Sequence, residues 1–463
     1  MEHPEAPLPD VPIELRWEVA SDAAFTRVLQ HGRTLASPDE AHSARVELRG
    51  LLPQSQAPRR FFYRFMLGEA TSPVGRACSL PPTASDAPLR LALASCQHFE
   101  LGYFAAHRDM AQQALDLVVF VGDYIYEYAS APGRARQHGG GHCITLADYR
   151  ARYAIYKADA DLQRAHASCS WVMTWDDHEV SNDYANDRSA DSRGSEFLAR
   201  RAAAYQAYWE HQPLPRSLKP VGPNMPIFRA YRWGNTAQLH MLDARQHRDY
   251  QACTPSDQGG SRTIFDDSCA QRKAGAQSLL GETQEHWLIE QLARSPAAFN
   301  LMGQASLMAP MRMPRDRRDP LSPADAYWND SWDGYTQART RLLQHFAAAR
   351  NVVSLGGDVH ATYICDLKLD FDHEKSPTIA TEFVGTSITS PSWPQAATER
   401  IMSHNPHMVF AKSDQRGYTL FDITPKQLQA QLRVLDNARI ESPLVTTHAR
   451  FVVDPKRAGA LLA

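Results

Sequence analysis

The chain has 463 residues, of which 43% are hydrophobic and 22% are charged, an ordinary balance for a globular protein with a sizeable core. Its net charge is -3, from 49 basic and 52 acidic residues, so nothing favours electrostatic capture of nucleic acid or of an anionic membrane. A run of about 18 apolar residues, the minimum for a membrane-spanning helix, does not occur. We therefore expect no membrane span and no specific nucleic-acid binding.

The seven cysteines lack the C-x-x-C spacing of zinc ribbons and redox dithiols. Because seven is an odd number, at least one of them stays outside any disulfide. Cys253 and Cys269 flank a polar, glycine-containing loop and could pair in an oxidising compartment, which the sequence leaves open.

Residues 1–82 differ in pattern from the rest of the chain. The first ten are acidic and rich in proline, without the basic and apolar regions of a signal peptide. Alternation of apolar and polar residues at 13–19 and 44–48, and an aromatic-rich run at 61–66, predict short strands. These strands suggest a small all-β domain, a fibronectin- or immunoglobulin-like sandwich, followed by a linker at 83–88.

Residues 89–463 predict an α/β domain in which strands and helices alternate. The expected strands lie at 91–95, 117–122, 170–175, 227–233, 238–243, 299–304 and 351–356, and the expected helices at 104–115, 146–156, 196–211, 282–294 and 334–349. After residue 356 helix signals fade, and strands are expected at 378–384, 418–423, 428–435 and 449–453. The simplest architecture is two sheets packed together with helices outside.

The stretch from Leu117 to Glu127 reads L-V-V-F-V-G-D-Y-I-Y-E. Its unbroken apolar run is typical of a strand buried on both faces of a parallel sheet. Gly122 lets the backbone turn, and Asp123 follows at the carboxyl end of the strand, where open α/β sheets bind their ligands. An aspartate there can equally cap the next helix, so this stretch alone leaves its role open.

Reactive side chains recur at four predicted strand ends, which favours a metal site over chance loop composition. They are Cys96 after the first strand, Asp123 and Tyr126 after the second, Asp177, His178 and Asn182 after the third, and Asp358 and His360 after 351–356. Each has a structural alternative, such as a buried thiol, a core ring, an ion pair or an Asx turn. Arg245 is equally an anion clamp or a surface charge, and 312–319 predicts a solvated loop.

The residue types narrow the choice of metal. Carboxylates and an amide suit a hard divalent ion such as Ca²⁺, Mg²⁺ or Mn²⁺. A thiolate and a phenolate, if Cys96 and Tyr126 both bind, suit a more Lewis-acidic ion such as ferric iron. Asp123 lies between the other clusters in the sequence, so it is the natural carboxylate to bridge two ions.

With these residues assembled, the chain resembles the PhoD-like alkaline phosphatases, a branch of the calcineurin-like metallophosphoesterases. The resemblance runs from about residue 12 to the end of the chain and includes the N-terminal β-domain. The matching stretches are S-C-Q at 95–97, G-D-Y-I-Y-E at 122–127, W-D-D-H-E-V-S-N-D at 175–183, L-D-A-R-Q-H-R-D at 242–249, S-W-D-G-Y at 331–335, G-G-D-V-H at 356–360 and N-P-H-M-V-F-A-K-S-D-Q-R-G-Y at 405–418.

The resemblance implies a phosphoesterase that contains Fe³⁺ and Ca²⁺. Carried onto this sequence, it places Cys96, Asp123, Tyr126 and His360 around iron, and Asp123, Asp177, Asn182 and Asp358 as candidate ligands of calcium. His178 stands where related phosphoesterases assist the leaving group, and Arg245 looks like a phosphate-contacting arginine. We expect a monomer that hydrolyses small phosphate monoesters or diesters, or a teichoic-acid-like polymer, with a metal-bound oxygen as the nucleophile.

Two alternatives and the cellular location stay open at this stage. One is a catalytically inactive binding protein on the same scaffold, and the other is a redox enzyme that uses Cys96 as a thiol. Relatives usually carry a twin-arginine export signal and a G-V-A-S-G-D-P segment, neither of which stands in this sequence. The chain is therefore expected in the cytoplasm if its start is genuine, and outside it if its relatives are the guide. Loops 131–145 and 250–276, expected to be mobile, should decide between monoesters and diesters.

Overall fold

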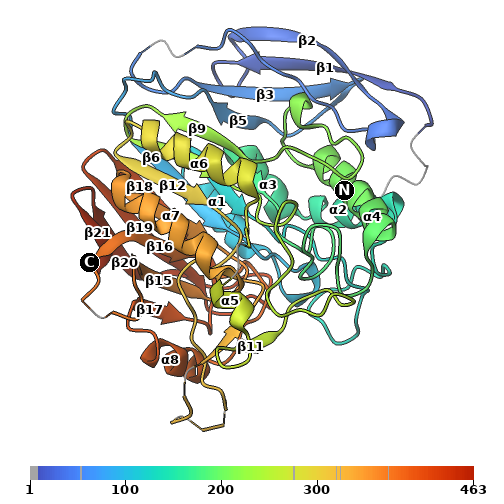
Figure 1. Cartoon of the computed structure of the whole chain (residues 1–463). Coiled ribbons are helices and arrows are strands. Elements are labelled where there is room, and N and C mark those ends of the chain that lie inside the picture. The colour runs from blue at the N-terminus through green and yellow to red at the C-terminus, as the bar shows by residue number, and fades with distance from the viewer. Residues whose placement is uncertain are drawn as a thin grey trace.

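A computed structural model of the protein describes residues 9–52, 55–274, 277–316, 318–319, 321–323, 325–373 and 375–463. Residues 1–8, which hold most of the acidic, proline-rich start, lie outside the described residues, and so do parts of the loops 250–276 and 312–319. Two large sheets with helices on their outer faces form the body of the molecule, and a smaller sheet lies across one end (Figure 1).

The N-terminal region consists of short antiparallel strands, which confirms its all-β character. They are β1 (Ile13–Ala20), β2 (Val28–Ala36), β3 (Arg60–Leu67), β4 (Ala70–Thr71) and β5 (Gly75–Cys78). The described strands form one five-stranded sheet, in the order β2-β1-β3-β4 with β5 paired to β3, and not the two sheets of a sandwich.

Residues 44–48 were predicted to form a strand, but they have no regular secondary structure. Val46 and Leu48 line a cavity together with Trp17 and Phe65 of the neighbouring sheet. Every second side chain of this segment therefore packs on the sheet face while its backbone pairs with no strand. An alternating pattern cannot separate these two cases, because both bury every second side chain.

The first large sheet has seven strands in the order β21-β20-β19-β18-β6-β7-β8. Its strands are β6 (Leu89–Ala94), β7 (Leu117–Val121), β8 (Ser170–Thr174), β18 (Arg416–Thr424), β19 (Gln427–Leu435), β20 (Val445–Asp454) and β21 (Arg457–Leu462). Strands β6, β7 and β8 are parallel, and the C-terminal strands extend the sheet by antiparallel pairing.

The second large sheet also has seven strands, in the order β17-β15-β16-β14-β12-β10-β9. They are β9 (Arg229–Trp233), β10 (Ala237–Met241), β12 (Phe299–Gly303), β14 (Val352–Gly356), β15 (Thr362–Lys368), β16 (Thr378–Val384) and β17 (Met408–Lys412). Its centre is parallel, from β10 through β12 and β14 to β16, and its edge strands are antiparallel. The sequence did not predict β15 or β17.

The core between the two sheets explains the unbroken apolar run of β7. Val119 and Val121 point into a cluster that also contains Leu301 of β12 and Leu355 of β14, from the opposite sheet. The alternate residues of β7 point the other way, as Phe120 does, into a cluster formed with helices. Both faces of the strand are buried, as the sequence predicts.

Helices cover the outer face of each sheet (Figure 1). Their bounds are α1 (Ala105–Gln112), α2 (Leu146–Lys157), α3 (Ala160–Ser168), α4 (Gly194–His211), α5 (Ala270–Ala274), α6 (Glu282–Arg294), α7 (Thr336–Ala348) and α8 (Gln395–Ser403). Helices α1 to α4 pack on the first sheet, and α6 to α8 join the outer core of the second. Among the described residues, no helix has the length and apolar character needed to cross a membrane.

Three of these helices, α3, α5 and α8, were not predicted. Helix α5 lies in the stretch 250–276, which was expected to be a loop. Helix α8 lies in the part of the chain where helix signals fade; it is nine residues long, too short to give a sustained helical period. Helix α3 begins directly after α2, at a break where Asp159 accepts hydrogen bonds from the first N–H groups of α3. The sequence pattern stops at α2 and misses this second helix.

The expected linker at 83–88 lies against the turn between β9 and β10. The backbone N–H of Asn235 donates to Ser85 O at 2.7 Å, and Arg232 donates from a guanidinium N–H to Thr83 O at 2.8 Å. Gly234 permits this contact, since a Cβ there would lie 2.1 Å from Ser85 O. We retain the division of the chain at 82 and 88 as a proposal.

Cys253 and Cys269 form a disulfide, the pairing that the sequence left open. The loop that they close contains β11 (Thr263–Phe265), which pairs with β13 (Ala326–Trp328) in a two-stranded sheet. Regular structure and a covalent bond therefore hold much of the segment 250–276.

Candidate metal centre

Strand ends from both large sheets supply the reactive side chains. Cys96 follows β6, Asp123 follows β7, and Asp358 and His360 follow β14. In that order their backbone φ angles are 58°, 57°, 65° and 55°, all in the left-handed region. Residues other than glycine seldom adopt this conformation, and it persists where surrounding contacts hold a functional side chain in place.

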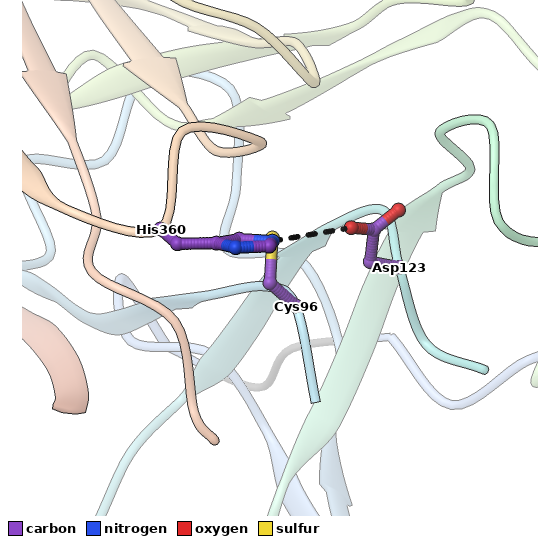
Figure 2. A group of neighbouring side chains, drawn as sticks. All are labelled: Cys96, Asp123 and His360. Carbon is purple, nitrogen blue, oxygen red and sulfur yellow. Dashed lines mark ion pairs between the residues drawn. The ribbon is translucent and has the colours of Figure 1, made fainter. Parts of the chain in front are cut away.

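Cys96, Asp123 and His360 form the first group of possible metal ligands (Figure 2). One ligand atom of each lies within 4.8 Å of the other two. His360 Nε2 is 3.8 Å from Asp123 Oδ2, the ion pair drawn as a dashed line in Figure 2. Tyr126 joins them, because its hydroxyl donates to Asp123 Oδ2 at 2.9 Å and lies 3.2 Å from His360 Nε2. The four residues expected around iron therefore lie together.

Ser390, which the sequence did not single out, links this group to the next loop. Its Oγ lies 2.7 Å from the Tyr126 hydroxyl and 3.0 Å from the backbone oxygen of Cys96. The surrounding segment V-G-T-S-I-T-S-P-S-W, at 384–393, contains no charged or metal-binding residue type. No sequence signal marked this serine.

Asp123, Asp177 and His178 form the second group, again with ligand atoms within 4.8 Å of one another. We call both groups, with Tyr126, the metal centre. His178 Nδ1 lies 2.8 Å from Glu127 Oε2, so the other ring nitrogen, Nε2, is the one left for chemistry. Burial disfavours the charged imidazole, but nearby carboxylates, Asp177 first among them, raise the pKa of His178 well above its ordinary value.

Asn182 lies in the turn that follows Asp177. Its backbone N–H donates to Glu127 Oε1 at 2.7 Å, and its side-chain Oδ1 accepts from the Tyr128 hydroxyl at 2.7 Å. The backbone N–H of the next residue, Asp183, donates to Asp177 Oδ2 at 2.6 Å. The turn thus places Asn182 next to the second group, with its amide oxygen engaged by a tyrosine.

Asp358 lies on the other side of the centre, where it lines a pocket together with His360. Burial first, and then the negative charge of Asp177, raise the pKa of Asp358 well above its ordinary value. Asp358 therefore lies close enough to Asp177 for the two carboxylates to repel each other.

Arg245 lies deeper than a phosphate contact would. Its side chain is 0% exposed, its Nε donates to Asp176 Oδ1 at 2.5 Å, and its NH1 lies 2.7 Å from Asp330 Oδ2. Its NH2 is 3.7 Å from Asp177 Oδ1. The guanidinium therefore forms ion pairs with three buried aspartates. We revise its expected role from an anion clamp to the buried cation that holds Asp176 and Asp177 in place.

Negative charge exceeds positive charge around the centre. Burial and mutual repulsion raise the pKa of Asp176 well above its ordinary value and that of Asp183 to about 7. Asp123 Oδ1 and Asp177 Oδ1 are buried and have no hydrogen-bond partner in the part of the chain that the structure describes. Unpartnered buried carboxylate oxygens are costly unless a cation neutralises them. The residues present therefore fit bound metal ions.

Glu179 fixes the turn that carries Asp123. Its carboxylate accepts from the backbone N–H groups of Asp123 at 3.1 Å, Tyr124 at 2.5 Å and Asp176 at 2.8 Å. Three N–H groups from two strand ends thus share one carboxylate. Burial and the charge of Asp123 raise the pKa of Glu179 to about 8, although these hydrogen bonds oppose the shift.

Glu127, Glu179 and Asp330 are functional neighbours that the sequence did not assign. The first two lie inside the motifs at 122–127 and 175–183, and each is 1% exposed. Asp330 directly precedes the S-W-D-G-Y motif and binds Arg248 NH1 at 2.7 Å as well as Arg245. Their position in or beside a family motif was the sequence signal that could have identified these residues. A motif alone does not distinguish a metal ligand from a residue that positions one.

Gly122→Ala should displace Asp123 and lower activity. Gly122 has φ +94°, and a Cβ there would lie 2.4 Å from the Asp176 Cβ and 2.6 Å from its N. Strain and clash both fall on the turn that carries Asp123, so we expect kcat to fall roughly 100-fold, the effect of an ångström-scale misplacement. Gly133→Ala is the control, since its φ is +74° but nothing lies within 4 Å of its Cβ. Equal kcat values for the two variants would show that the close contact is unimportant.

The chain is similar to known phosphatases in both sequence and structure. A family model described as PhoD-like phosphatase matches residues 91–432, and one for the N-terminal domain of PhoD-like phosphatases matches residues 3–81. The chain is 40% identical over 464 residues to alkaline phosphatase D of Bacillus subtilis (strain 168), covering 98% of this chain and 76% of that protein. A solved structure described as that of PhoD superposes with a TM-score of 0.90 at 39% identity, covering 98% of this chain and 86% of the other. The chain belongs to the PhoD-like phosphatase family and is a metal-dependent phosphoesterase.

Proposed function

We propose that the protein hydrolyses small phosphate monoesters and diesters with ferric iron and calcium at the metal centre. The proposed iron ligands are Cys96, Asp123, Tyr126 and His360, and the proposed calcium ligands are Asp123, Asp177, Asn182 and Asp358. A thiolate and a phenolate suit the more Lewis-acidic ion, and carboxylate and amide oxygens suit calcium. The observation that carries the proposal is that Asp123 belongs to both groups of possible ligands.

Bound ions would supply Lewis acidity toward the phosphate oxygens. Around them, the protein orients groups and moves protons. His178 is held through Nδ1 by Glu127, so a proton on Nε2 can pass to the leaving oxygen of the ester. Arg245 keeps Asp177 in place and balances part of its charge.

The centre also favours an enzyme over the two alternatives. An inactive binding protein needs no complete ligand set, yet every proposed ligand residue is present at or beside the centre. A redox enzyme needs an accessible, activated thiol. Cys96 is 1% exposed, so its thiol is not accessible to a redox partner. We further propose that the protein is a monomer. We also propose that it matures in an oxidising compartment, because the disulfide Cys253–Cys269 is most stable there.

Elemental analysis of the purified protein, combined with hydrolysis of p-nitrophenyl phosphate and bis(p-nitrophenyl) phosphate, tests the proposal. We expect about one iron per chain, and activity that a calcium chelator abolishes and added Ca²⁺ restores. Magnesium added to the chelated enzyme is the control for a general need for a divalent ion. Full activity in iron-free protein would contradict the assignment of iron, and hydrolysis of neither substrate by the metal-loaded protein would contradict the proposed function.

A further inference from the structure

An apolar pocket of about 440 Å³ adjoins the metal centre. Asp358 and His360 form the wall that it shares with the centre. Its other walls are largely aromatic and aliphatic, with side chains from β13 and from the loops after β12, β13, β14 and β16. The apolar lining residues on which the inference rests are Leu307, Met311, Met313, Trp328, Val359 and Trp393.

The imidazole of His360 connects the pocket to the centre directly. Its Nε2 faces the ligand group, 3.2 Å from the Tyr126 hydroxyl, while its Nδ1 lies 2.9 Å from Pro391 O, in the pocket wall. One ring thus has one nitrogen at the centre and the other at the pocket. A group bonded to a phosphate at the centre needs to extend only past this ring to enter the pocket.

The lining decides what kind of group the pocket accepts. No Lys or Arg is among the lining residues in the described part of the chain, so the pocket supplies no counter-charge for a second phosphate or a carboxylate. Two indole rings and two thioethers offer flat, polarisable surface instead, which favours aromatic rings. The volume falls in the range of small-molecule sites, roughly 300 to 1,000 Å³.

Two polar groups of the lining add a further feature. The Ser392 hydroxyl and the indole N–H of Trp393 are buried and have no hydrogen-bond partner among the described residues. A bound group that carries a hydrogen-bond acceptor could satisfy either of them.

A second pocket, on the far side of the segment 391–393, has the opposite character. It is lined by Arg134, Arg416 and Arg439 and by several polar residues, and it shares only that segment with the apolar pocket. Anionic or strongly polar parts of a ligand are better served there. The contrast supports an uncharged occupant for the apolar pocket.

We propose, resting on the function proposed above, that this pocket binds the organic substituent of the phosphate ester and selects an uncharged aromatic group. Trp328 and Trp393 are then residues that determine specificity, while the metal centre binds the phosphate itself. An ester with a small polar substituent, such as glycerol phosphate, leaves the pocket empty and gains nothing from it.

Calorimetric titration of the metal-loaded enzyme tests this inference with three ligands that are not hydrolysed. Inorganic phosphate reports the metal centre, methylphosphonate adds a substituent too small for the pocket, and benzylphosphonate adds an aromatic ring. We expect benzylphosphonate to bind roughly tenfold more tightly than methylphosphonate, as contact with aromatic side chains allows. Trp393→Ala and Trp328→Ala should remove most of this preference and leave the affinity for phosphate within about twofold.

Trp287→Ala is the matched control. Trp287 is a half-buried tryptophan of α6 that packs on Phe228 and lies outside the pocket lining, so its loss should keep the preference. Trp328 is 38% exposed, so its substitution removes little buried surface and leaves the fold intact. Equal affinities for the two phosphonates in the wild type, or a preference that survives in both pocket variants, would overturn the inference. Turnover of p-nitrophenyl phosphate, measured separately, shows whether the proposed function itself fails.

Discussion

Asp123→Asn should reduce the hydrolysis of p-nitrophenyl phosphate by roughly 1,000-fold or more and lower the metal content of the protein. Asp123 is the residue shared by the two ligand groups, and its Oδ1 is buried without a partner in the described part of the chain. An amide of the same shape removes one negative charge from the point where the two ligand groups meet. A loss of several kcal/mol of transition-state stabilisation corresponds to that change in rate.

The fold should survive this substitution, because asparagine keeps an oxygen that can accept from the Tyr126 hydroxyl. Circular dichroism and thermal unfolding in the presence of chelator would check it. Asp161→Asn is the control: Asp161 is a buried aspartate that pairs with Arg108 and Arg164 and belongs to neither ligand group. That variant should lose stability yet retain its metal and its kcat. Wild-type activity in Asp123→Asn would refute a two-ion centre built on this carboxylate.

Arg245→Met should destabilise the protein by about 3–5 kcal/mol, the usual effect of removing one partner of a buried ion pair. Arg248 still pairs with Asp330 in this variant, but Asp176 loses the Nε donor at 2.5 Å. Asp176 and Asp177 then lose the one guanidinium that lies against both of them, so bound ions carry more of their neutralisation. Urea unfolding of metal-loaded and metal-free protein would measure the effect, and the metal-free protein should lose more.

The same variant separates the two roles considered for Arg245. If the guanidinium only holds carboxylates, stability falls, and the KM for substrate changes less than kcat. If it binds phosphate instead, KM rises strongly while stability hardly changes. Arg33→Met is the control, since Arg33 and Glu14 form an exposed pair, with side chains 69% and 51% exposed, and its loss should leave unfolding almost unchanged.

The sequence predicts the strands that carry ligands because each has a strong local signal. The run at β7 is apolar throughout, since helices cover one face and the opposite sheet covers the other. Two local patterns misled or were too short to read. Residues 44–48 alternate without forming a strand, and α8, at nine residues, is too short to give a sustained helical period. Elements stabilised mainly by distant contacts cannot be recognised from the pattern of their own residues.

The residues of the candidate site also differ in whether the sequence could identify them. Cys96, Asp123 and His360 could be found because each lies within a few residues of the end of a strand. The setting of Arg245 could not, because its partners Asp176 and Asp330 come from segments far apart in the chain. The pocket was missed for a similar reason. Met313 lies in the stretch 312–319, which was predicted to be solvated, yet it is 6% exposed and lines the pocket.

The disulfide Cys253–Cys269 has a practical consequence for preparing the enzyme. Its loop supplies Ser261, whose Oγ donates to Asp183 Oδ2, and Arg262, whose backbone N–H donates to Asn329. A host cytoplasm keeps thiols reduced, so protein made there would lack the bridge across 16 residues, which contributes about 3 kcal/mol by restricting the unfolded chain. Batches from reducing and oxidising hosts would differ in how firmly this edge of the site is held. A thiol count on each batch is therefore needed before specific activities are compared.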